Sequence, residues 1–147
     1  MAYWQGVNVN TGAVELPKYN SEGVFEEIYI AAVGTAMVAG DTIYGPTIAA
    51  GLFVKDITAA PDKLDSAGSG ALTFEVGYQN SGTTVVGGFI ATGNTTGQAG
   101  GIQKANVPTT YGQTFANTTT VIAVITNSAG TAVAGNFRLG ASLTASP

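Results

Sequence analysis

The residues from Leu72 to Tyr78 alternate strictly along the chain. The even-numbered side chains are apolar, whereas Thr73, Glu75 and Gly77 are polar or small. This period of two is typical of a β-strand with one buried face. The run ends at residues 80–82, where Gly82 can adopt a positive φ and allow the chain to reverse. Such a strand is stable only with partners, so the rest of the sequence has to supply them.

Further short apolar runs, each bounded by turn residues, predict those partners. A break is expected at Gly45-Pro46, a bulge or a close backbone approach at Gly87-Gly88, and burial on both faces toward the end of the strand at residues 24–32. The predicted strands cover residues 24–32, 42–44, 52–57, 85–91, 109–115, 118–126 and 137–143. Residues 109–115 and 118–126 are expected to form a hairpin whose second strand is central. About eight antiparallel strands, with no long amphipathic helix, predict an all-β fold, either a β-sandwich or a jelly roll.

Two segments are predicted to make contacts outside this core. Residues 1–23 are expected to form an extended N-terminal arm ahead of a β-sandwich domain at 24–147, although Trp4 folding back on its own core is an open alternative. Residues 92–106 are rich in glycine and predict a long exposed loop. The interface candidates are Tyr3, Trp4, Val7 and Val9 in the arm, and Asn94, Gln98, Ile102 and Gln103 in the loop.

Composition argues against several functions. The 147 residues contain 0 Cys and 0 His, which removes thiolate ligands and the usual general base. A net charge of -4, with only five scattered cations, makes nucleic acid an improbable partner. The start lacks the pattern of a secretory signal, and the longest apolar window is shorter than the roughly 20 residues of a membrane span.

The remaining acidic residues give weak candidates for chemistry. Glu26 and Glu27 are adjacent on a strand and point to opposite faces, so they cannot act on one substrate. Asp62 and Asp65 could bind calcium, but Lys63 and Leu64 interrupt the ligand set, and a plain solvated loop is the favoured alternative. We therefore expect no catalytic, cofactor or metal site, and no enzyme activity.

The weakly charged composition suits a protein that packs against other proteins. Charged residues make up 10% of the chain, well below the roughly 25% of ordinary domains. Threonine on outward strand positions keeps such a surface polar, and docking it does not require ions to be desolvated.

Several segments together resemble a known family. They are Ala39–Pro46, Gly51–Asp56, Leu72–Tyr78, residues 119–124 and residues 132–143. In this order they are similar to small structural proteins of tailed bacteriophages, the head decoration or cement proteins. The chain departs from the family pattern at residues 45–48 and in its glycine-rich loop.

The resemblance implies a non-catalytic β-sandwich without cofactors, made in the host cytoplasm. It also implies a homotrimer that binds the major capsid protein on the exterior of the virion capsid and stabilises the head. A second hypothesis remains open, a carbohydrate-binding or adhesive β-sandwich module of a virion fibre or a cell surface. In that case Tyr78, Tyr111 or Trp4 would provide a flat stacking platform.

Overall fold

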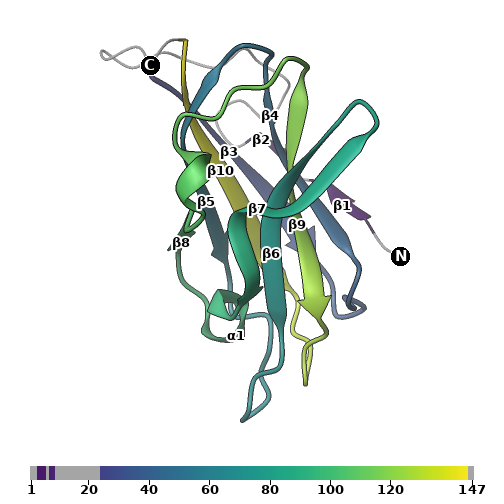
Figure 1. Cartoon of the computed structure of the whole chain (residues 1–147). Coiled ribbons are helices and arrows are strands. Elements are labelled where there is room, and N and C mark those ends of the chain that lie inside the picture. The colour runs from purple at the N-terminus through teal and green to yellow at the C-terminus, as the bar shows by residue number, and fades with distance from the viewer. Residues whose placement is uncertain (1–2, 6, 9–23, 146–147) are drawn as a thin grey trace.

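The computed structural model describes residues 3–5, 7–8 and 24–145, and its fold is all-β (Figure 1). Two short helical turns, α1 (Thr96–Ala99) and η1 (Pro108–Thr110), interrupt the strands. The strands are β1 (Tyr3–Gln5), β2 (Val7–Asn8), β3 (Val24–Val33), β4 (Thr42–Ile48), β5 (Phe53–Pro61), β6 (Thr73–Asn80), β7 (Thr83–Asn94), β8 (Gln103–Lys104), β9 (Thr119–Asn127) and β10 (Gly135–Thr144).

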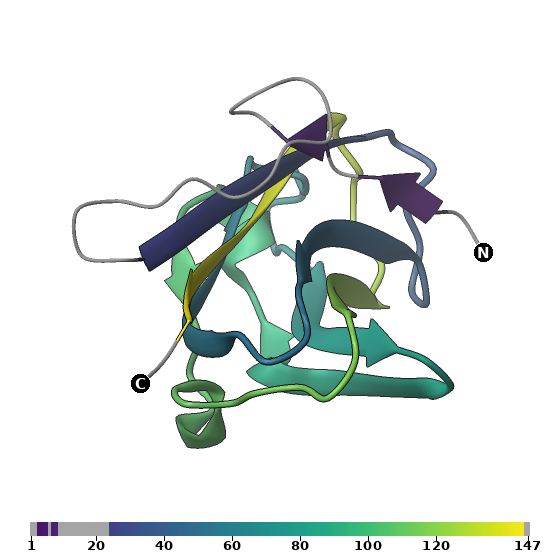
Figure 2. The same ribbon diagram turned by 90° about the horizontal axis from the view of Figure 1, so that it is seen from above.

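The strands form two sheets, which Figure 2 shows as two layers. Their orders are β1-β4-β9-β6-β7 and β2-β3-β10-β5-β8. β3 pairs with β10, β4 with β9, β5 with β8 and β6 with β7, all antiparallel. This is the strand order of a jelly roll, a long hairpin folded over on itself into two sheets. The predicted fold class is therefore confirmed.

The core lies between the two sheets and is built from the alternation seen in the sequence. On β6, Leu72 (just before the strand), Phe74 and Val76 are fully buried, and Tyr78 is half-buried. On β10, alternate residues from Phe137 to Leu143 are buried. The rings of Phe74 and Phe137 meet edge to face with centroids 5.0 Å apart, so the two sheets contact each other through an aromatic pair.

The predicted central strand is confirmed, but its predicted hairpin partner is wrong. β9 lies between β4 and β6. Residues 109–115 do not pair with it: they begin in η1 and then run beside β5, where Val54 N–H donates to the Gln113 carbonyl and Gly112 N–H donates to the Val54 carbonyl. Gly112 has a φ of 90°, which turns the chain toward β5.

The predicted break at Gly45-Pro46 is also wrong, because β4 continues through it. Tyr44 pairs with Ile122 and Thr47 with Thr120, so β4 carries one extra residue there. In such a bulge a proline does not have to donate to the ladder. Glycine is needed beside it, since a Cβ on Gly45 would lie 2.8 Å from the Leu139 side chain of the other sheet.

The outer face of β3 differs from the prediction. Burial on both faces was expected, yet Ile28 is 45% exposed and Ala32 is exposed. No layer of described residues covers this side of the sheet. The bulge at Gly87-Gly88, in contrast, is confirmed. Tyr78 of β6 pairs with Val85 of β7 and Val76 pairs with Ile90, so β7 has extra residues between these two pairs.

Candidate interaction surfaces

The N-terminal strands lie at the edges of both sheets. β1 pairs in parallel with β4, from Tyr3 opposite Thr42 to Gln5 opposite Tyr44. β2 pairs antiparallel with β3. The structure describes the backbone of Tyr3, Trp4 and Val7 but not their side chains, and Val9 lies outside the described residues. The contacts expected of these four residues therefore stay a prediction.

The segment predicted as a long loop, residues 92–106, has structure of its own. β7 extends to Asn94, and α1 and β8 follow. Gly97 and Gly100 in this segment approach other parts of the chain closely. A Cβ on Gly97 would lie 2.8 Å from the Leu72 side chain, and Gly100, with a φ of 82°, approaches the backbone of Lys63.

The four loop candidates differ in how far they can contact a partner. The Gln98 side-chain amide donates to the Leu72 carbonyl at 2.8 Å, and the Asn94 side chain accepts from Thr96 N–H. Gln103, also half-buried, donates to the Lys104 carbonyl. Ile102 is 72% exposed. Of the four, only Ile102 presents most of its side chain to solvent.

Asp65 is buried and accepts hydrogen bonds from five backbone amides, at 2.8–3.0 Å. The donors come from two loops, residues 67–72 and 130–131. The amides of Thr131, Ala71 and Gly130 contribute most to holding the pKa of Asp65 well below its usual range. The carboxylate joins the two loops, and its lone pairs are already in use. A calcium ion bound at Asp65 would have to displace these backbone amides.

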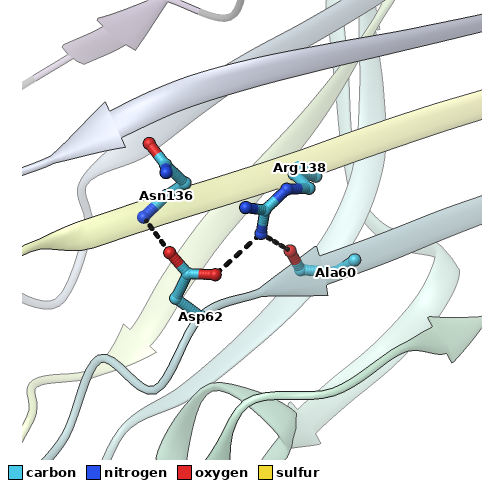
Figure 3. Close-up of polar contacts among 4 residues, drawn as sticks. All are labelled: Ala60, Asp62, Asn136 and Arg138. Atoms are coloured by element: carbon cyan, nitrogen blue, oxygen red, sulfur yellow. Dashed lines mark hydrogen bonds and ion pairs between the residues drawn. The ribbon is translucent and has the colours of Figure 1, made fainter.

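Asp62, which follows the last residue of β5, takes part in a different structural contact (Figure 3). Its carboxylate accepts from Arg138 at 2.8 Å and from Asn136 N–H at 2.8 Å. Arg138 also contacts the Ala60 carbonyl at 3.4 Å. The Arg138 hydrogen bond, followed by that of Asn136, lowers the pKa of Asp62. The ion pair connects the end of β5 to β10.

Glu26 and Glu27 lie on opposite faces of β3, as predicted. Glu26 is exposed and pairs across the ladder with Ser142, whereas Glu27 is 6% exposed and lies opposite the buried Ala141. Burial raises the pKa of the Glu27 carboxyl. Among the described residues, no group of three or more Asp and Glu side chains could hold a metal ion.

Tyr78 and Tyr111, both considered for a stacking platform, contact different aromatic rings. Tyr78 packs its ring against Phe89 and Phe115, with centroids 5.5 Å and 4.6 Å away. Tyr111 is 67% exposed and meets Phe53 edge to face at 5.4 Å. Tyr111 is therefore the tyrosine of the two whose ring is available to a ligand.

Fold and surfaces together define a jelly-roll protein in which Asp62 and Asp65 bind groups of the chain itself. In the part of the chain that the structure describes, no helix has the length and hydropathy to cross a bilayer. Sequence reasoning missed the role of Asp65. The available signal was an aspartate beside a loop of small residues, whose many free backbone amides need an acceptor.

Comparison with known proteins identifies relatives of the fold. No protein-family model matches the sequence, and no curated protein matches it at a significant level. A chain of the structure described as "Capsid of Ralstonia phage GP4" aligns with a TM-score of 0.81 and 20% identity over 99% of both chains. A chain of "Cyanophage Pam1 capsid asymmetric unit" aligns with a TM-score of 0.70 and 21% identity, covering 93% of this chain and 96% of that one. The chain thus shares its whole fold with components of two phage capsid structures.

Proposed function

We propose that this protein is a structural component of a bacteriophage capsid. In this proposal it is a decoration or cement protein that binds the major capsid protein on the outer surface of the head and stabilises the shell without catalysis. The observation that carries the proposal is the alignment with the GP4 capsid chain over 99% of both chains. Because the match extends from end to end, it concerns the entire chain and not a widespread core alone.

The chemistry of the surface supports the same proposal. Only 10% of residues are charged, so a large contact can form with little desolvation of ions. The strongest acid contacts, those of Asp62 and Asp65, are used to hold loops. A rigid sandwich with loops fixed in this way suits a protein that binds a shell and has to keep its shape under mechanical load.

The N-terminal residues are proposed as an arm that contacts a neighbouring subunit or the shell. Tyr3, Trp4, Val7 and Val9 carry the large apolar side chains of this arm. The strands that contain Tyr3, Trp4 and Val7 have only three and two residues, so few ladder hydrogen bonds oppose an exchange onto a neighbour. We propose a homotrimer for the bound state.

The test uses heads that lack this protein and the purified full chain. Added protein is expected to sediment with the heads and to reduce release of packaged DNA after heating or osmotic shock. Deletion of residues 1–10 is expected to lower occupancy. Absence of the full chain from the sedimented heads contradicts the proposal, whereas unchanged occupancy after the deletion contradicts only the role of the arm.

Exposure of Tyr111 favours a second candidate, the carbohydrate-binding module. The ring is fixed by Phe53 and borders a hollow of about 240 Å³ that is also lined by Lys55, Asp56 and Asn106. A pyranose could stack on such a ring and bond to these polar groups. Binding on a glycan array that is lost in Tyr111→Ala, together with no attachment to heads, selects this candidate instead.

A further inference from the structure

The exposed apolar side chains are unevenly distributed over the molecule. Among the described residues, the large hydrophobic side chains that are exposed are Ile28, Val38, Val86, Ile102 and Tyr111. Two of them, Ile28 and Ile102, line one shallow groove of about 410 Å³. This groove lies on the outer face of the sheet formed by β3, β10, β5 and β8, away from the core.

The strand register explains why a groove exists there. Gly140 on β10 lies between Ile28 of β3 and Thr58 of β5, and Thr58 pairs in turn with Lys104 of β8. Alternate residues of β10 point to the core, so Gly140 faces outward and contributes no side chain. The floor of the groove is therefore backbone, and its apolar sides come from Ile28, Ala60 and Ile102.

Gly140 is not required by the fold itself. A Cβ added there would meet its nearest atoms, in Glu27, Ile28 and Thr58, at 3.6–3.8 Å, which is ordinary van der Waals contact. By comparison, a Cβ on Gly45 or Gly77 would lie 2.8 Å or less from its neighbours. Glycine in a strand interior lowers stability, and here no close packing explains it. A surface that must admit another chain does explain it.

Charge divides the groove into two ends. At one end, Glu26 and Asp56 flank Ser142 from the two neighbouring strands, about 10 Å apart at two strand spacings. Glu26 has no cation within ion-pair distance among the described residues, whereas Asp56 is already paired with the exposed Lys104 ammonium, 3.7 Å away. At the other end, Arg138 is already bound to Asp62. The open electrostatic position is thus one for a cation beside Glu26, near Ser142.

We infer that this groove is the docking site for an extended segment of the major capsid protein, with an aliphatic side chain over Gly140 and a lysine or arginine beside Glu26. This inference rests on the proposed function and specifies the contact surface. An aliphatic side chain would cover Ile28 and Ile102. A basic group would pair with Glu26 without displacing Arg138 from Asp62 or Lys104 from Asp56.

The test is a sedimentation assay with heads that lack this protein, using the full chain and three variants. Gly140→Leu fills the groove from its floor. Gly68→Leu is the matched control, because Gly68 has no atom within 4 Å of an added Cβ and lies in the loop before β6. Glu26→Gln removes the charge while keeping the shape. Circular dichroism and the thermal midpoint confirm that each variant is folded.

We expect Gly140→Leu to weaken binding to heads at least about tenfold, the effect of losing one buried anchor, while Gly68→Leu binds like the wild type. Glu26→Gln is expected to bind more weakly at low ionic strength and to lose part of the salt dependence. Folded Gly140→Leu that binds heads like the wild type overturns the inference and leaves the proposed function standing. Wild-type protein that does not bind heads overturns both. Loss of self-association with intact head binding assigns the groove to a second copy and also overturns the inference.

Discussion

The aromatic pair between the sheets offers a quantitative test of the fold. Phe74 on β6 and Phe137 on β10 are both 0% exposed, with ring centroids 5.0 Å apart and planes at 82°. Truncating a buried phenylalanine to alanine loses its transfer free energy and leaves a cavity, at a cost of about 3–5 kcal/mol. For a domain of this size we expect Phe137→Ala to lower the Tm by roughly 6–20 °C.

A double-mutant cycle isolates the contact between the two rings. Phe74→Leu, Phe137→Leu and the double variant preserve most of the core volume, so the coupling free energy reports the edge-to-face geometry. We expect about 0.5–1.5 kcal/mol of coupling. Urea unfolding followed by circular dichroism gives each free energy of unfolding, with an unchanged m-value.

The control is Val86→Ala, at a side chain that is 49% exposed, for which a change within about 0.5 kcal/mol is expected. A cost below about 1 kcal/mol for Phe137→Ala, or a coupling indistinguishable from zero, would refute the reasoning. Either result would mean that the two sheets do not share one core at these positions.

Three further predictions follow from individual side chains. Asp65→Asn is expected to lower the Tm at neutral pH. Because the folded-state pKa of Asp65 is lowered, the wild type is expected to lose stability as pH falls below about 4. Unfolding measured against pH is expected to show a shallower acid dependence for Asp65→Asn. Glu27→Gln is expected to raise the Tm at pH 7. Because burial raises the pKa of Glu27, the protonated carboxyl favours the folded state at low pH, and this stability is lost as pH rises through the folded-state pKa. An unchanged Tm contradicts this expectation. Gly77→Ala is expected to cost at least about 2 kcal/mol in urea unfolding, because its Cβ would lie 1.9 Å from the Val85 carbonyl oxygen, whereas Gly140→Ala is expected to be close to neutral.

Where the sequence alternated cleanly, its prediction was correct, because one face of each such strand meets the core. The strands around Phe74 and Phe137 are examples. The turn after the first of them was also predicted correctly: it lies at Ser81-Gly82, and Gly82 has a φ of 76°. Local pattern is enough when burial is decided by a single face.

Errors arose where distant segments decide the conformation. Pro46 was expected to end a strand, but a bulge opposite β9 accommodates it. The glycines of residues 92–106 predicted a long exposed loop, yet Leu72 approaches Gly97 closely and Lys63 approaches Gly100 closely. Neither contact is visible within a window of neighbouring residues.

The candidate sites show the same limit. Adjacent carboxylates on β3 had to point apart, and the prediction for Glu26 and Glu27 followed from geometry alone. The role of Asp65 depends on amides from residues 130–131, which are far away in the sequence. The groove over Gly140 could not be predicted, because it requires β3, β10, β5 and β8 to be placed side by side.

The most direct test of the proposed function is a cryo-electron microscopy reconstruction of the phage head that contains this chain. We expect a jelly roll on the outer surface of the shell, with the face that carries Ile28 and Gly140 against the major capsid protein. A shell without this density, or a jelly roll found only on a tail fibre, would contradict it.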